Sequence, residues 1–114
     1  MTVYAAIIYT SDVDWTEPQY ADQMAEYGAF GAAAAAVIRG GAALYPTSTA
    51  TQVRVDAAGE TVSSDGPYAE TKEALTGFYL LECADLDEAI AWAARIPAAR
   101  DGVVEVRPVI PMEG

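Results

Sequence analysis

Ionisable side chains gather most closely in the segment Ser63–Leu81, where Asp65, Glu70 and Lys72 follow one another over a short stretch of chain. A carboxylate in such a group can act as a general base, and a lysine can stabilise an anionic substrate or an enolate. These residue types predict proton-transfer chemistry with Asp65, Glu70 and Lys72 as catalytic candidates. A structural interpretation stays open, in which Asp65 ties a turn at Gly66-Pro67 and Glu70 pairs with Lys72.

The sequence contains no histidine. This excludes Ser-His-Asp and Cys-His catalysis and leaves a carboxylate, a tyrosine, a lysine or a thiol as the general base. The one cysteine, Cys83, lies in an apolar strand pattern and is expected to be a buried, inert thiol. Asp65, Glu70 and Glu73 are possible ligands for a hard cation, but their spacing is not that of an EF-hand loop. We expect no metal and no cofactor.

Four further side chains are candidates for binding a substrate. Tyr9, Tyr68 and Tyr79 each offer an apolar ring with one polar tip, which suits a small aromatic molecule as well as plain packing. Arg107 can hold a carboxylate through two hydrogen bonds, or it can have a structural role in an edge or cross-strand pair with Glu105, beside it on the final strand, or with Arg54. Substrate binding by Tyr9, Tyr68, Tyr79 and Arg107 and a purely structural role both remain open.

The charge balance limits the class of partner. The chain has 114 residues, with 17 acidic and 6 basic side chains and a net charge of −11. Nucleic acid and anionic membranes would be repelled by this charge, so neither is expected as a partner. The length suits a single domain over residues 1–114. No leader pattern or long apolar stretch is present, so we expect a cytoplasmic protein.

The hydrophobic pattern predicts two helices and several strands. A helix is expected to begin at a cap on Thr16 and to run to about Ile38 before Gly40-Gly41, and Asp85 is expected to cap a second helix. The predicted strands are Val3–Tyr9, Thr51–Asp56, Glu60–Ser63, Gly77–Cys83 and Val103–Val109. This order predicts an α+β sandwich, with an antiparallel sheet and two helices on one face. The other face must be covered, and a second copy of the chain would cover it.

The segment Asp65–Glu73 resembles the signature of the DGPF branch of the YCII-related family, with Tyr68 where phenylalanine is usual. The resemblance extends to Gly77–Leu81, Asp85–Ala89, Trp92–Pro97 and Val104–Val109. It implies a ferredoxin-like fold that pairs as a dimeric α+β barrel. Better-studied relatives are thought to use a His–Asp dyad, which is absent here because no histidine is present and Ile96 precedes Pro97.

Two functions follow from these observations. One is an isomerase or lyase acting on a small cyclic or aromatic metabolite, with Asp65 as base, Lys72 as electrostatic stabiliser and Tyr68 and Tyr79 as pocket walls. The alternative is a non-catalytic small-molecule-binding or regulatory protein. The resemblance links such a protein to extracytoplasmic-function sigma factors. Both functions predict a homodimer with a small-molecule ligand.

Overall fold

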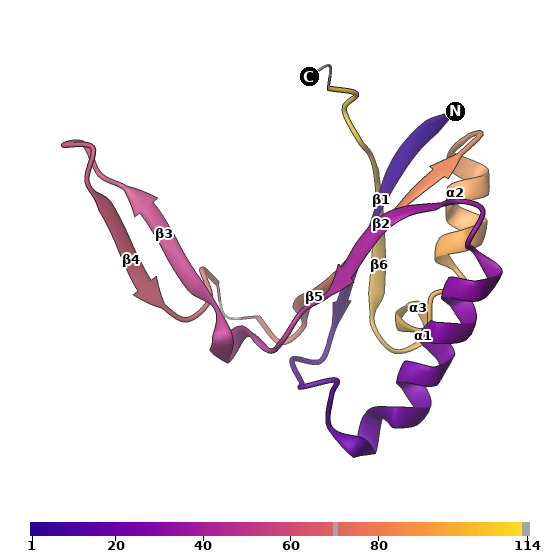
Figure 1. The fold of residues 1–114 in the computed structure, drawn as a ribbon, viewed down its shortest axis with the longest axis horizontal. Coiled ribbons are helices and arrows are strands. Elements are labelled where there is room, and N and C mark those ends of the chain that lie inside the picture. Colours follow the sequence, from indigo (N-terminus) through magenta and orange to yellow (C-terminus); the bar gives the residue numbers. More distant parts are fainter. Residues whose placement is uncertain (70, 113–114) are drawn as a thin grey trace.

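The computed structural model describes residues 1–69 and 71–112 and is built around one antiparallel sheet. Its four strands have the spatial order β2-β5-β1-β6, which is the ferredoxin-like order. Figure 1 shows the sheet at the centre of the molecule, with both chain ends at one end of it. The strands are β1 (Thr2–Thr10), β2 (Ile38–Ala43), β5 (Ala74–Cys83) and β6 (Val103–Pro108).

The helices all lie on one face of this sheet (Figure 1). They are α1 (Ala21–Ala33), α2 (Leu86–Ala93) and the short α3 (Ala98–Asp101). The predicted α+β sandwich, with an antiparallel sheet and its two main helices on one face, is confirmed. No helix in the described part of the chain has the length and apolar character needed to cross a membrane.

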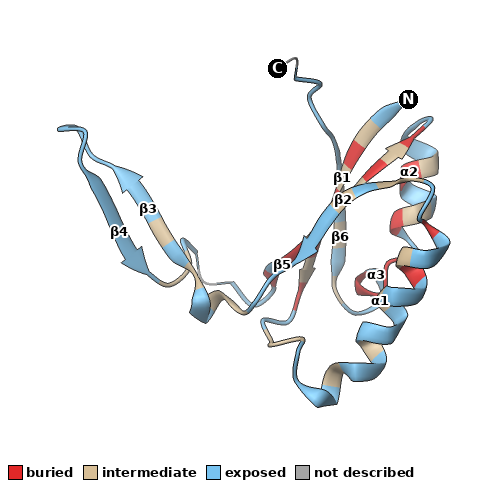
Figure 2. Ribbon diagram, viewed as in Figure 1, coloured by how far each residue is buried: buried red, intermediate tan, exposed pale blue. Residues whose placement is uncertain are grey.

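Strand register decides which side chains meet the helices. In β1, Tyr4, Ala6 and Ile8 are buried, whereas the alternating Ala5 and Ile7 are only half-buried. Because successive side chains of a strand point to opposite faces, the first set faces the helices and the second set faces away. Buried residues therefore concentrate between sheet and helices (Figure 2).

The centre of the other sheet face is apolar, and we call this face the open face. Ala5 pairs with Leu80 and Ile7 with Phe78, so these four side chains lie on it together. No helix covers this face in the described part of the chain (Figure 1). Its charged members include Glu82, Glu105 and Arg107, and its apolar members include Val3, Ala5, Ile7, Ala42, Leu75, Phe78, Leu80 and Val103.

A separate two-stranded hairpin leaves the body of the protein. It consists of β3 (Thr51–Val55) and β4 (Thr61–Asp65), which pair only with each other. We call residues 51–65 the arm. The expected turn at Asp56–Gly59 is confirmed, because the Asp56 carboxylate accepts hydrogen bonds from the backbone N–H groups of Ala58 and Glu60 at 2.9 Å each. All strand residues of the arm except Gln52 are exposed (Figure 2).

The first helix is shorter than the sequence pattern predicted. α1 ends at Ala33 and Ile38 already begins β2, so the expected continuation to Ile38 was wrong. Pairing of β2 with β5 satisfies the backbone of this segment, which outweighs the helix preference of the alanine run. The predicted cap on Thr16 was also wrong, because its hydroxyl donates to the Asp14 carboxylate at 2.6 Å.

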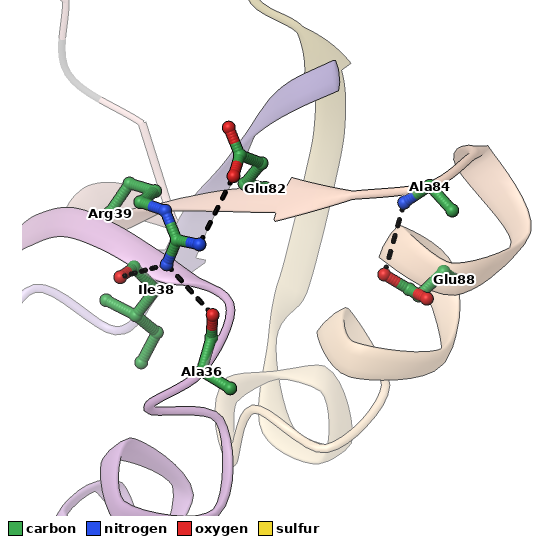
Figure 3. A network of polar contacts seen from close by, with 6 residues as sticks. All are labelled: Ala36, Ile38, Arg39, Glu82, Ala84 and Glu88. Carbon is green, nitrogen blue, oxygen red and sulfur yellow. Dashed lines mark hydrogen bonds and ion pairs between the residues drawn. The ribbon is translucent and has the colours of Figure 1, made fainter. Parts of the chain in front are cut away.

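A charged side chain fixes the turn from α1 into β2. The Arg39 guanidinium donates to the backbone oxygens of Ala36 (2.9 Å) and Ile38 (3.1 Å) and to the Glu82 carboxylate on β5 (3.2 Å) (Figure 3). These contacts hold the first residues of β2 against its neighbouring strand. They lie at the surface, where an ion pair adds only up to about 1 kcal/mol.

The cap of α2 predicted from the sequence is present. The Asp85 carboxylate accepts the Glu88 backbone N–H at 2.9 Å, and the Glu88 carboxylate accepts the Ala84 N–H at 3.2 Å (Figure 3 draws the latter). The hydrogen bond from the Glu88 N–H to Asp85 satisfies a backbone donor that the first turn of a helix would otherwise leave unpaired.

We predict that Asp85→Ala lowers the free energy of unfolding by about 1 kcal/mol, because the α2 cap is lost. Urea denaturation monitored by circular dichroism measures this change. Asp87→Ala is the matched control, since it removes an acidic side chain from the same first turn without removing a cap. Equal losses in the two variants would show that the cap is not the cause.

Candidate functional site

The best-formed hollow lies between α1 and the β2–β5 side of the sheet. Its volume is about 230 Å³. Aromatic and apolar side chains from the loop before α1, from α1 and from the sheet line it, among them Trp15, Met24, Tyr27 and Tyr79. We call it the apolar pocket. A concave apolar site with a few polar groups is typical of small-molecule binding.

Small residues on β2 and β5 leave room for this pocket. Gly41, Ala42, Ala43 and Gly77 form its sheet-side wall. A Cβ atom on Gly41 would lie 2.5 Å from the backbone oxygen of Phe78, and Gly41 also has a φ of +156°. A larger residue is therefore excluded at Gly41 by both space and backbone conformation.

Two threonine hydroxyls form a buried chain beside the pocket. The Thr10 and Thr76 Oγ1 atoms are 2.8 Å apart, and the Thr10 hydroxyl also donates to the backbone oxygen of Ser11 at 3.2 Å. A hydroxyl has one proton to donate. Thr76 is therefore the donor in the bond to Thr10, and the remaining lone pair of its oxygen is an acceptor at the pocket, which Thr76 lines.

Two phenols supply the other polar groups of the pocket. Burial and, to a smaller extent, the nearby phenol of Tyr79 raise the pKa of Tyr27 to about 12, against the opposing effect of a hydrogen bond from the Ala98 backbone N–H. Burial also raises the pKa of Tyr79. Both phenols are therefore neutral at physiological pH. They can donate hydrogen bonds to a ligand, but they are poor bases.

The pocket is chemically neutral. Among the described residues that line it, none carries a formal charge. Hydroxyl donors on Tyr27 and Tyr79 and an acceptor on Thr76 can orient a ligand, but no lining group can take up a proton at neutral pH. The arrangement is suited to binding and orientation.

Of the six predicted site residues that the structure describes, only Tyr79 lines this pocket. Its ring packs against Phe30 of α1, with ring centres 5.1 Å apart. Tyr9 pairs with Leu75 and lies on the open face. Arg107 pairs with Ala5 and is an exposed member of the same face on the edge strand β6. The sheet thus separates Tyr79 from Tyr9 and Arg107.

Three of the remaining candidates, Asp65, Tyr68 and Lys72, lie in the part of the chain that follows the arm or ends it. Asp65 is exposed at the end of β4, and Lys72 is exposed in the segment before β5. Tyr68 is 80% exposed, and the Arg54 guanidinium lies 5.3 Å from the centre of its ring. Glu70 lies outside the described residues. The structure does not bring Asp65, Tyr68 or Lys72 to the apolar pocket.

The signature segment borders a second, more polar hollow of about 410 Å³. Pro67, Ala69 and Thr71 line one side of it. On the other side the Asp12 carboxylate accepts the Thr47 backbone N–H at 2.9 Å and also the Thr47 hydroxyl. Asp12 is thus occupied in holding a turn. In the described part of the chain, no three acidic or thiol side chains are grouped closely enough to hold a metal ion.

Sequence reasoning missed three pocket residues. Tyr27 belongs to a helical stripe that is usual for core packing, and Trp15 stands in a polar loop, so neither pattern indicated a ligand site. Thr76 carried a signal, because it is a hydroxyl residue at the start of an otherwise apolar strand. Its pairing with Thr10, 66 positions away, needs the tertiary structure.

The raised pKa of Tyr27 predicts a loss of stability at high pH. Folding holds the phenol proton more tightly than the unfolded chain does, so this contribution is full below about pH 10 and is lost as the pH rises towards 12. Urea unfolding between pH 8 and 12 should show a shallower decline for Tyr27→Phe than for the wild type. The control Tyr68→Phe removes an exposed phenol and should keep the wild-type profile. A parallel decline in Tyr27→Phe would contradict the assignment.

Comparison with known proteins identifies the family. Residues 8–113 match the YCII-related domain. Over 70 residues the chain is 51% identical to the uncharacterized protein R00369 of Rhizobium meliloti (strain 1021). The aligned part is 60% of this chain and 56% of that relative, so the chain spans little more than half of the relative's length. Because the domain match covers nearly the whole chain and agrees with the ferredoxin-like strand order, the chain belongs to the YCII-related family.

Proposed function

We propose that the protein binds a small, mainly apolar molecule in the apolar pocket without transforming it. The neutrality of the pocket carries this proposal: aromatic and aliphatic walls surround the hydroxyls of Tyr27, Thr76 and Tyr79, and no described lining residue is charged. This corresponds to the second of the two functions considered from the sequence. The ligand would be uncharged, because a charged group in such a site would lose its hydration without gaining a counter-charge.

Pocket size and polarity narrow the ligand class. A volume of about 230 Å³ is below the range of about 300–1,000 Å³ that holds drug-sized ligands. A single ring with one or two oxygen atoms fits this space. Neutral phenols donate to a carbonyl oxygen, and Thr76 accepts from a hydroxyl. We therefore infer a phenol, a cyclic ketone or a lactone.

Catalysis is the competing proposal. It would need a base, and the predicted base Asp65 is exposed at the end of β4, outside the apolar pocket. The polar hollow beside Pro67 and Thr71 is the place where the signature could act on a substrate. The nine-residue match at Asp65–Glu73 supports membership of the DGPF branch. For this reason the experiment below also tests catalysis at these residues.

The protein is further proposed to be a homodimer. The open face carries a continuous apolar set on neighbouring strands, of which Ile7 and Phe78 are directly paired. Contiguous apolar patches of this kind mark interaction sites on soluble proteins. A second copy of the same face is the partner that the ferredoxin-like architecture suggests.

The proposed function is tested by ligand binding, read out by thermal shift and by intrinsic tryptophan fluorescence, to which Trp15 at the pocket and Trp92 at the core both contribute. A panel of phenols, cyclic ketones and lactones should contain compounds that raise the melting temperature, since a ligand at about 100 times its Kd adds about 2.7 kcal/mol. Tyr27→Phe should weaken these compounds about 3- to 10-fold, because one hydrogen bond is lost.

Tyr68→Phe is the matched control, since it removes one phenol hydroxyl outside the apolar pocket and should leave the affinity unchanged. Asp65→Asn separates the two functions. A compound that binds Tyr27→Phe as well as the wild type but binds Asp65→Asn weakly would place the site at the signature. Consumption of that compound by the wild type would then favour the enzyme.

A further inference from the structure

The arm is the least supported part of the fold. Figure 1 shows it projecting from the sheet on the side opposite the helices, with its strands clear of the body. A two-stranded hairpin on its own is at best marginally stable in water, and it needs a further layer against one of its faces. The radius of gyration of the chain is 16.1 Å, whereas about 13 Å is expected for a compact domain of this length.

One face of the arm makes contacts with its own chain. Gln52 and Arg54 lie on this face, since side chains alternate along β3. The Gln52 amide donates to the backbone oxygen of Pro67 at 2.9 Å, and Arg54 packs over the ring of Tyr68. This face therefore has contacts within the protomer, although Arg54 and Tyr68 stay exposed.

The opposite face has no such cover. Val53 pairs with Ser63 and Val55 with Thr61, so these four residues lie together, and we call them the valine face. Val53 is 65% exposed and Val55 is 67% exposed. None of the four is charged. β-branched side chains at alternate positions are typical of a face that packs against another layer.

We propose that the valine face of each arm packs against a second copy of the chain, so that two protomers hold each other with their arms. This inference rests on the proposed homodimer and adds to it a second contact region, distinct from the open face. The arm stands on the same side of the sheet as the open face (Figure 1), so a copy seated on that face lies beside the arm. Twofold symmetry then places two arms in equivalent contacts.

The exposed area agrees with a second copy as the occupant. The chain exposes 7617 Å², whereas a folded monomer of 12.0 kDa is expected to expose about 6000 Å². The excess of about 1600 Å² is about twice the area that one partner buries in a standard interface. Contacts through the open face and the arm together would account for such an excess.

The net charge of the protein favours the valine face as the part of the arm that contacts a second copy. Each copy carries a net charge of −11, so contacts between two copies are disfavoured wherever acidic groups meet. The four residues of the valine face are uncharged, so this part of the arm can approach an equally acidic copy without this repulsion. The nearest charge on the same face is Asp65, which pairs with Thr51 at the base of the arm. The members of the valine face are small and regular, which suits close packing against another apolar surface.

The base of the arm is held in a fixed position. The Asp12 carboxylate fixes the Thr47 turn just before β3, and the Gly66 N–H just after β4 donates to the Ala50 oxygen at 2.8 Å. Gly66 has a φ of +98°, which glycine adopts without strain. An arm anchored on both of its strands is prepared for binding, which lowers the entropy cost of association.

The test is sedimentation analysis of Val53→Glu against its matched control Val62→Glu. Both variants place a carboxylate in the middle of the arm, but Val62 pairs with Arg54 on the face opposite to the valine face. Val53→Glu should raise the dimer Kd roughly 100-fold or more, because each dimer would bury two unpaired charges. Val62→Glu should change the Kd by no more than about threefold, since its carboxylate can pair with Arg54.

The results of this experiment distinguish the proposed arm contact from the proposed dimer. A wild-type dimer that Val53→Glu weakens no more than Val62→Glu overturns the arm contact and leaves a dimer formed through the open face. A wild-type monomer at micromolar concentration overturns both proposals. Neither result bears on ligand binding in the apolar pocket, which is measured separately.

Hydrogen exchange gives a readout in the unaltered protein. Backbone amides of β3 and β4 should exchange at least about 10-fold more slowly above the dimer Kd than below it, because a lone hairpin opens readily. The turn Asp56–Gly59 is the internal reference. Equal exchange of β3 and β4 at both concentrations would show an arm that stays in solvent and would overturn the proposal.

Discussion

The pairing of β1 between β5 and β6 is the constraint on which the rest of the structure depends. It places Tyr4, Ala6 and Ile8 against the helices, and it leaves Ile7 on the open face beside Phe78. A slip of one residue would exchange the two sets, so the register is fixed by the need to bury the first set under the helices. The core and the open apolar face are thus two results of the same alternation.

The apolar pocket also follows from this arrangement. Gly41 allows β2 to lie close to the backbone of β5. Because Gly41 and its neighbours on β2 are small, space remains between them and α1, and aromatic side chains line this space. Its polar groups are neutral: burial holds the phenol of Tyr27 in its protonated form, and the Thr76 hydroxyl is hydrogen-bonded to the Thr10 hydroxyl. Such a site is suited to the recognition of shape and of single hydrogen bonds, as the proposed binding of a small neutral molecule requires.

Two charged residues of the signature segment lie close to the arm in the chain. Asp65 is the last residue of β4, and Lys72 follows shortly afterwards, so both lie near the base of the arm. Their position beside the turn that Asp12 holds connects them with the orientation of the arm and with the polar hollow. The charged groups Asp65 and Lys72 and the apolar pocket are therefore separated in space, although Lys72 and Thr76 are only four positions apart in the chain.

The sequence by itself determined the α+β class, the hairpin turn at Asp56, the Asp85 cap and the resemblance to the YCII-related family, because alternation, turn residues and capping residues act over a few positions. It overestimated the first helix, since the alanine run favours a helix locally and only pairing with β5 makes Ile38–Ala43 a strand. The tertiary structure alone decided that Tyr79 shares a pocket with Tyr27 and Thr76 while Tyr9 and Arg107 lie across the sheet. The physical reason is distance along the chain: a pocket is made by contacts between remote segments, and local patterns carry no information about which segments meet.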